Sequence, residues 1–166
     1  MRYIIIFILS LLPLQTILAG TLKTGDTAPN WTLQDKGGKT VEYYKDSKDR
    51  VSVVLFWASW CPYCATLMPH LEVIYRKYRN KGLRFYAIDA LEDGKRDPVA
   101  LFEEKGFTYT MLLEGDLVAE EWGVRATPGV FVIDKDKKVI YKRPAGVSDI
   151  LVKQNMDLKI KQALAR

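Results

Sequence analysis

Residues 57–64 read WASWCPYC and contain both cysteines of this 166-residue chain, Cys61 and Cys64. Two thiols at this spacing can cross-link a fold, hold a metal ion or exchange electrons with another thiol pair. A disulfide between them would close a loop of four residues, which stabilises a fold by roughly 2 kcal/mol before strain is subtracted. A bridge placed for stability would close a longer loop, so a purely structural disulfide is not expected.

A closed metal site is not expected either. Structural zinc needs four ligands, and the chain offers two cysteines and a single histidine, His70. On a helix, His70 would share a face with Thr66 and Lys77, away from the face of Cys64, so we expect it at the surface. The sequence therefore predicts no metal ligands and no bound cofactor.

Electron exchange accounts for the proline that follows Cys61 and for the spacing of the two cysteines. Pro62 is favoured in the first turn of a helix and so places Cys61 at the helix start, beside free backbone N–H groups and the positive end of the helix dipole. These groups stabilise a thiolate, so Cys61 is expected to be the accessible, attacking sulfur. Cys64 lies one turn further on and faces inward, where it can displace whatever Cys61 captures.

The segments on either side of the cysteines predict two parallel strands joined by a helix. Residues 51–57 are a continuous β-branched and aromatic run, typical of a strand covered on both faces. Residues 83–89 form a second such run. Between them, from Cys61 to about Asn80, apolar residues recur at the spacing of one helical face: Cys64, Leu67, Met68, Leu71, Ile74, Tyr75 and Tyr78.

The remaining segments extend this unit into an α/β fold with a mixed central sheet flanked by helices. Residues 31–44 alternate around Gly37-Gly38 and predict an N-terminal β-hairpin extension. Further patterns predict helices over 98–105, 116–122 and 148–165, a strand over 109–113, and an antiparallel hairpin formed by 130–133 and 139–142.

The first twenty residues have the outline of a secretory signal peptide. Arg2 precedes an apolar run over residues 3–12, and Ala19-Gly20 precede a polar segment. Pro13 and polar residues interrupt the run, which is shorter than the roughly 20 apolar residues of a spanning helix. We expect residues 1–20 to be a signal peptide, cleaved or retained as an anchor, and residues 21–166 to form a single domain. Export would place the cysteines in a periplasmic or otherwise extracytoplasmic compartment, where disulfides persist.

Composition and charge exclude other classes. With 48% hydrophobic and 27% charged residues, the chain is typical of a globular protein rather than a disordered one. The formal net charge is +5, and basic residues are interleaved with acidic ones, as in residues 135–138. Solvated helix faces and turns explain these runs, so binding to nucleic acid is not expected.

Two motifs together resemble a known family. FWASWCPYC, with Pro69 five residues after Cys64, is similar to the active-site helix of thioredoxin-fold proteins, and GVRATPGVFVID at residues 123–134 is similar to their cis-proline loop. The resemblance is greatest to the exported TlpA/ResA-like thiol-disulfide oxidoreductases and runs from about Gly25 to Val147. It implies a thioredoxin-like fold for this part of the chain.

The resemblance also implies site residues. Cys61 matches the nucleophilic cysteine and Cys64 the resolving one, while Pro128 matches the cis-proline beside them. The Thr127 backbone would then be free to pair with an extended client segment. Around Cys61, the residues expected to line the approach of the client are Trp60, Pro62 and Tyr63, whereas Trp57 is expected in the core.

The sequence departs from the family at the positions that handle protons. Leu55 stands where thioredoxins carry a buried aspartate, and Leu67 stands where several TlpA/ResA-like members carry a glutamate. Water or another carboxylate would have to take the proton of Cys64, and Asp89 and Glu92 are candidates. Pro62-Tyr63 between the cysteines is the pair common in glutaredoxins, which leaves the direction of electron flow open.

The sequence thus predicts an exported enzyme whose Cys61–Cys64 dithiol reduces disulfides of extracytoplasmic client proteins, with a role in cytochrome c maturation implied by the resemblance. A membrane or soluble redox partner would recharge the dithiol, and we expect a monomer. The alternatives are a DsbA-like oxidant or isomerase, and a non-enzymatic metallochaperone. A peroxidase is disfavoured because peroxidatic motifs do not enclose a Cys-x-x-Cys pair.

Overall fold

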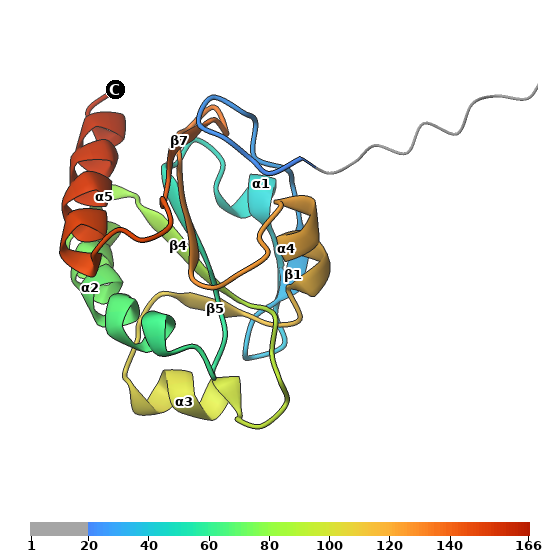
Figure 1. Ribbon diagram of the computed structural model, residues 1–166. Helices are drawn as coiled ribbons and strands as arrows, with labels where there is room; N and C mark the ends of the chain where they lie inside the picture. The colour runs from blue at the N-terminus through green and yellow to red at the C-terminus, as the bar shows by residue number, and fades with distance from the viewer. Residues whose placement is uncertain (1–19) are drawn as a thin grey trace, which may run out of the picture.

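A mixed five-stranded sheet lies at the centre of the computed structural model, which describes residues 20–166 (Figure 1). The strand order is β5-β4-β3-β6-β7; β3, β4 and β5 run parallel, and β6 is antiparallel to both β3 and β7. The strands span Ser52–Trp57 (β3), Arg84–Asp89 (β4), Thr110–Leu112 (β5), Gly129–Ile133 (β6) and Val139–Lys142 (β7). The predicted mixed sheet and its parallel central pair are confirmed.

Strand β3 is the central strand, and all six of its residues are buried. Its side chains alternate between two hydrophobic clusters, so that Leu55 and Trp57 belong to one cluster and Phe56 to the other. This explains why the run is apolar without interruption. Trp57, at the end of β3, lies opposite Asp89 of β4 and is 1% exposed, as predicted for a core residue.

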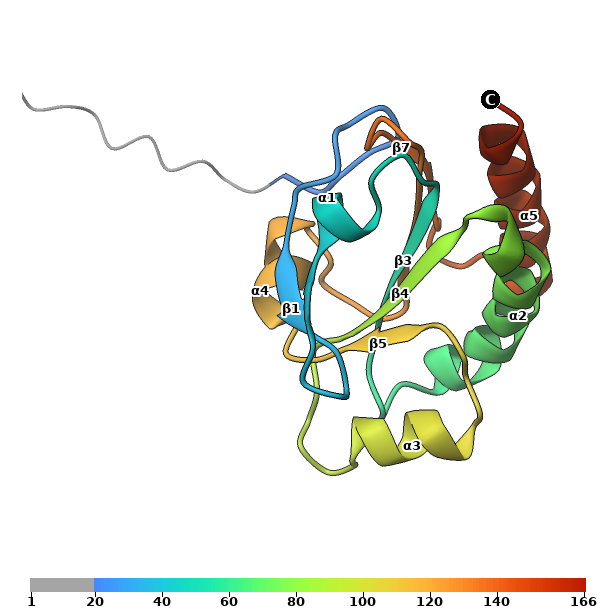
Figure 2. The ribbon, with the colours of Figure 1, turned by 180° about the vertical axis from the view of Figure 1, so that it is seen from behind.

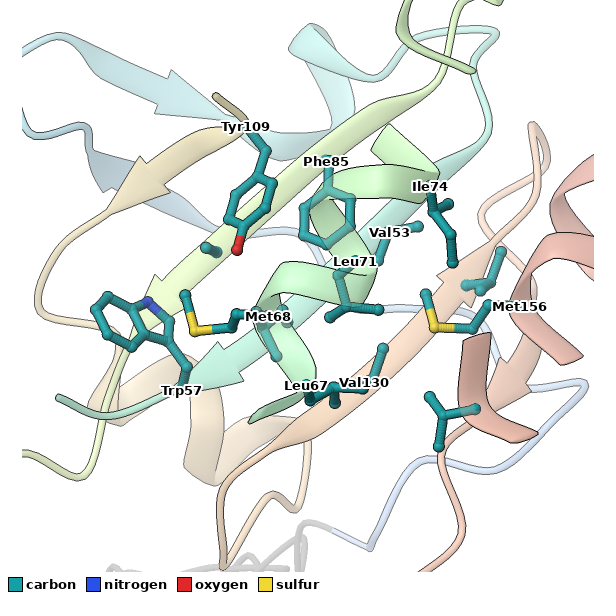
Figure 3. Packing of buried hydrophobic residues seen from close by; sticks show 14 of the residues in the cluster. Val53, Trp57, Leu67, Met68, Leu71, Ile74, Phe85, Tyr109, Val130 and Met156 are labelled. Atoms are coloured by element: carbon teal, nitrogen blue, oxygen red, sulfur yellow. The ribbon is translucent and has the colours of Figure 1, made fainter. Parts of the chain in front are cut away.

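Helices α2 (Pro62–Tyr78), α3 (Pro98–Glu104) and α5 (Asp149–Leu164) pack on the first cluster. Figure 1 shows α2 and α5 side by side on one face of the sheet, with α3 near the cysteine end of α2. The predicted apolar face of α2 is confirmed, except that Tyr75 is only half-buried. Its Leu67, Met68 and Leu71 belong to the same cluster as Met156 of α5 and the sheet residues drawn in Figure 3. A short 3-10 turn, Arg79–Lys81, follows α2.

The opposite face is covered by the antiparallel hairpin β1 (Thr32–Gln34) and β2 (Thr40–Glu42), and by α1 (Tyr43–Asp46) and α4 (Asp116–Glu121) (Figure 2). The predicted N-terminal hairpin is confirmed, but residues 43 and 44 belong to α1 and not to its second strand. The Tyr43 ring stacks on Trp31 with ring centroids 5.0 Å apart, and its hydroxyl hydrogen-bonds Ser52. These tertiary contacts bury Tyr43 beneath the hairpin and end the strand.

The predicted signal peptide, residues 1–20, lies outside the described residues apart from Gly20. Within residues 20–166, no helix is long and apolar enough to cross a membrane.

Candidate active site

Cys61 lies at the start of α2, directly after the turn that follows β3. Its backbone is extended, Pro62 is the first helical residue, and Cys61 is the N-cap. The backbone N–H of Cys64 donates to Cys61 Sγ at 3.2 Å, in the place where an N-cap oxygen would accept. The sulfur therefore occupies the helix-start position that the sequence predicts.

The cis-proline loop reaches the same sulfur from a distant part of the chain. The peptide bond between Thr127 and Pro128 is cis, and the Cys61 thiol donates to the Thr127 carbonyl at 3.5 Å. Pro128 is buried and Thr127 half-buried, between α4 and β6. The structure thus brings together the two motifs on which the family resemblance rested.

Both cysteines are reduced and buried, with residue exposures of 3% for Cys61 and 1% for Cys64. For Cys64 this was predicted; the expectation that Cys61 is openly accessible is wrong. The Cys61 sulfur is in contact with the Thr127 carbonyl and with the first turn of α2, and little of the residue is exposed. Burial, followed by the neighbouring Cys61 thiol, raises the pKa of the Cys64 thiol far above its ordinary value.

The aromatic residues beside the cysteines are exposed, as the sequence predicts. Tyr63 is 69% exposed and Trp60 is 43% exposed, and Pro62 between them in the chain is exposed as well. The Trp60 indole N–H donates to the Leu91 carbonyl at 2.7 Å, which fixes the ring at the rim of the site. Trp60 and Tyr63 therefore offer exposed aromatic surface beside the cysteines, and their contact with a client remains a prediction.

Hollows lie on both sides of the cysteine pair. A cavity of about 420 Å³ opens toward α3 and is lined by both cysteines, by Trp60 and by apolar residues, with Arg96 and Lys105 at its edge. A larger groove of about 960 Å³ runs along the cis-proline loop and is lined by Tyr63, Thr127 and Pro128 among others. All the predicted site residues border one hollow or the other.

Two carboxylates named from the sequence lie where the parallel strands β3 and β4 end. Glu92 accepts hydrogen bonds from both the backbone N–H and the hydroxyl of Ser59, two residues before Cys61. Asp89 is 8% exposed, and one of its carboxylate oxygens has no hydrogen-bond partner in the described chain. Burial, and then its neighbour Glu92, raises the pKa of Asp89 to about 8. A role for either carboxylate toward Cys64 remains a prediction.

The sequence did not identify the Ser59–Glu92 contact. A usable signal was present, because the carboxyl ends of adjacent parallel strands meet at one sheet edge, and both residues follow such ends. His70 is half-buried and borders a groove between α2 and α5, whereas the sequence predicted that it would be exposed at the surface. Across residues 20–166, no three His, Cys, Asp or Glu side chains gather into a group that could hold a metal ion.

Comparison with known proteins agrees with this geometry. Residues 24–142 match the AhpC/TSA family. Thiol-disulfide oxidoreductase ResA of Bacillus anthracis is 34% identical over 121 residues, which cover 72% of this chain and 68% of that protein. ResA of Bacillus subtilis (strain 168) is 24% identical over 139 residues, covering 83% and 76%.

A solved structure described as a thiol:disulfide interchange protein DsbE, from Chlorobium tepidum, superimposes with a TM-score of 0.73 at 28% identity. The match covers 87% of this chain and 99% of that one, so the sheet and its helices form a thioredoxin-like fold. The chain belongs to the AhpC/TSA family of thioredoxin-fold proteins, and within it to the thiol-disulfide oxidoreductases of the ResA and DsbE type.

Proposed function

We propose that the protein reduces disulfides in extracytoplasmic client proteins through Cys61 and Cys64. The observation that carries this proposal is the arrangement of the two sulfurs, with Cys61 at the α2 start and Cys64 buried one turn behind it. The Cys61 thiolate would attack one sulfur of the client disulfide, forming a mixed disulfide and releasing the first client thiolate. No bound cofactor is required for this step.

Resolution completes the exchange. The Cys64 sulfur, as thiolate, would attack Cys61 Sγ, so that the Cys61–Cys64 disulfide forms and the second client thiolate leaves. Two electrons pass to the client, and the two protons of the dithiol pass to the two client thiols. The raised pKa of Cys64 makes loss of its proton the step that needs assistance, by water or by a carboxylate such as Asp89 or Glu92.

The position of the cis-proline loop supports a binding mode for the client. The Thr127 backbone lies against the attacking sulfur, so a client segment that reaches Cys61 must pass beside it. We propose that an extended segment pairs with this backbone, while Trp60, Pro62 and Tyr63 contact its flanks.

The cellular setting is proposed from the relatives and from the leader. ResA relatives and the signal-like residues 1–20 favour an exported protein, in the periplasm or held at the membrane by its N-terminus. There a membrane or soluble redox partner would return electrons to the pair. The implied pathway is maturation of c-type cytochromes, and we propose that the enzyme acts as a monomer.

The direction of electron flow is testable by equilibrating the pair with glutathione or dithiothreitol buffers. We expect a reduction potential near the thioredoxin end of the scale, roughly −270 mV, because the relatives are of the ResA type. A potential near roughly −120 mV would instead assign the protein as a DsbA-like oxidant. Tight stoichiometric metal binding without exchange activity would favour a metallochaperone.

The roles of the two sulfurs are tested by two serine variants. Cys61→Ser should reduce disulfide exchange to the background rate, because the attacking sulfur is gone. Cys64→Ser should form a mixed disulfide with the client and fail to release it, so that mass spectrometry of the adduct also identifies the client. Full activity in Cys61→Ser would show that the roles are wrongly assigned.

A further inference from the structure

The groove along the cis-proline loop is lined by several basic side chains. We call it the loop groove; residues 123–131 form one wall and residues 142–149 the other, with Tyr63 and Thr66 at the end that belongs to α2. Arg125, Lys142 and Arg143 line it, and Asp149 is the only acidic residue among the lining residues. It therefore offers three cations against one carboxylate.

These three cations are not neutralised by the protein. Among residues 20–166, no carboxylate lies within 4.0 Å of any of them, although six other ion pairs form elsewhere. Lys142 instead donates to the Leu22 carbonyl at 3.0 Å. Burial, and then repulsion from Lys23 outside the groove, lowers the pKa of Lys142.

Arg143 is the best-placed partner for a ligand. The residue is half-buried, and its Nε is buried without a hydrogen-bond partner in the part of the chain that is described. A buried donor without an acceptor costs free energy, and a carboxylate is the acceptor that fits a guanidinium best. Arg125 is exposed and follows Val124 on the loop that leads to Thr127, so it faces the same groove from the opposite wall.

We propose that the loop groove binds an acidic side chain of the client, with Arg143 and Arg125 as its partners. The preferred clients would then carry Asp or Glu near the cysteine that Cys61 attacks. The inference rests on the proposed function, because it requires the client segment to pass beside Thr127. A neutral segment there would offer Arg143 only uncharged acceptors, which bind a guanidinium more weakly than a carboxylate does, and a basic segment would be repelled.

The test compares three peptides that each contain one disulfide and differ only in carrying Glu, Gln or Lys two residues from one cysteine. The reduced full-length protein is mixed with each, and release of the peptide dithiol is followed by chromatography. We expect the Glu peptide to react about threefold to tenfold faster than the Gln peptide at low salt, and the Lys peptide to be slowest. Salt at 0.5 M should reduce these differences.

Substitutions of the groove arginines test which side chains cause the preference for the Glu peptide. Arg143→Gln should lower the ratio of Glu to Gln rates toward one, with Arg125 supplying what preference is left. Because a half-buried residue can also affect folding, the exposed Arg125→Gln provides a second test, and Arg125→Glu should favour the Lys peptide. Lys159→Gln removes the same charge from an exposed position on α5 outside the groove and should keep the wild-type ratio.

The two possible failures are distinguishable. Equal rates with all three peptides, while exchange proceeds, would overturn the acidic preference and leave the proposed function intact. The same holds if the preference persists in both arginine variants, since the charge recognised would then lie elsewhere. Failure to reduce any peptide, although both thiols are reduced, would overturn the proposed function and this inference together.

Discussion

Cys61 and Cys64 are neighbours with different surroundings. Cys61 Sγ accepts the Cys64 backbone N–H and touches the Thr127 carbonyl, so it lies at the junction of a helix start and a loop. Cys64 faces the core on the apolar stripe of α2, and burial keeps its thiol protonated. These different surroundings fit the proposed roles, in which Cys61 attacks the client disulfide and Cys64 resolves the mixed disulfide.

The raised pKa of Asp89 predicts how the stability of the fold depends on pH. Its folded-state pKa of about 8 lies above the 3.8 of an unperturbed aspartate, so the folded protein retains a proton that the unfolded chain loses. The stabilisation that this retained proton gives the fold is fully present below about pH 4 and is lost as the pH rises through about 8. Asp89→Asn should remove most of this decline and raise the free energy of unfolding at pH 8 by about 1–3 kcal/mol.

Urea unfolding at several pH values measures this effect. Glu121→Gln, which changes an exposed carboxylate of α4, is the matched control and should retain the wild-type decline. If Asp89→Asn were instead less stable than the wild type at pH 8, the Asp89 carboxylate would be ionised and favourably bound. The same variant reports on catalysis: slower release of the client from Cys61, with unchanged capture, would assign Asp89 a part in deprotonating Cys64.

At the scale of elements, local pattern predicted most of the fold. The buried run of β3, the apolar face of α2 and the turn between β6 and β7 are each encoded within a few adjacent residues, and all three are found. Helix α1 was missed because the Tyr43 ring stacks on Trp31, a contact that becomes visible only when the hairpin folds over the sheet. Local propensity carries no information about such a contact.

Long-range contacts also limit how much of the site can be predicted from the sequence. The sequence predicted the two cysteines and Thr127-Pro128 as site residues, because each belongs to a motif. The burial of Cys61 and the hydrogen bonds from Ser59 to Glu92 depend on segments 66 and 33 residues apart in the chain. No spacing rule predicts how closely two such loops approach once the sheet has formed.

Helix α2 is attached to the segment before β5 through Glu72, which supplies a second prediction. Its carboxylate accepts from the backbone and hydroxyl of Thr108, at 3.0 and 2.6 Å, and from Arg76 at 2.7 Å. Burial raises the pKa of Glu72, but these hydrogen bonds outweigh it and hold the pKa below its ordinary value. The stabilisation is therefore present above about pH 4 and is lost as the pH falls further.

Glu72→Gln should lower the free energy of unfolding at pH 7 by about 1–3 kcal/mol, because it replaces charge-assisted hydrogen bonds with weaker ones. The destabilisation should shrink below pH 4, where the wild-type carboxylate also loses its charge. Denaturant unfolding of this variant is best compared with Glu104→Gln, which alters only a surface ion pair with Lys105 and should change stability little. Equal effects of the two substitutions would contradict the role given to Glu72.

At the scale of the whole molecule, one face of the central sheet is packed with aromatic residues and the other carries the helix that begins at Cys61. The hairpin, α1 and α4 cover one side with tightly packed aromatic rings, including Trp31, Tyr43 and Trp122. The other side carries α2, whose start bears the cysteines at the end of β3 (Figure 1). The turn that carries Cys61 therefore follows directly from a strand that is buried on both faces.

This arrangement links the direction of electron transfer to the stability of the whole fold. In a folded dithiol that is a stronger reductant than an unfolded Cys-x-x-Cys segment, the disulfide form must stabilise the fold more than the dithiol form does. For the proposed reductase, the oxidised protein should therefore exceed the reduced protein in free energy of unfolding, by about 2 kcal/mol for so short a loop. A DsbA-like oxidant would show the reverse order, because its reduced form is the more stable.

Parallel guanidinium unfolding curves, with and without excess dithiothreitol, measure this difference through the fluorescence of the buried Trp57 and Trp122. A variant with both Cys61 and Cys64 replaced by serine should give the same curve in both buffers, which shows that the reductant acts only through the pair. The difference in free energy of unfolding between the two forms can be converted to a potential at about 1.4 kcal/mol for each 30 mV. The result should equal the difference between the measured potential of the folded protein and that of the unfolded chain. If the reduced form unfolded at a higher guanidinium concentration than the oxidised form, the result would contradict the reductase proposal and favour the oxidant.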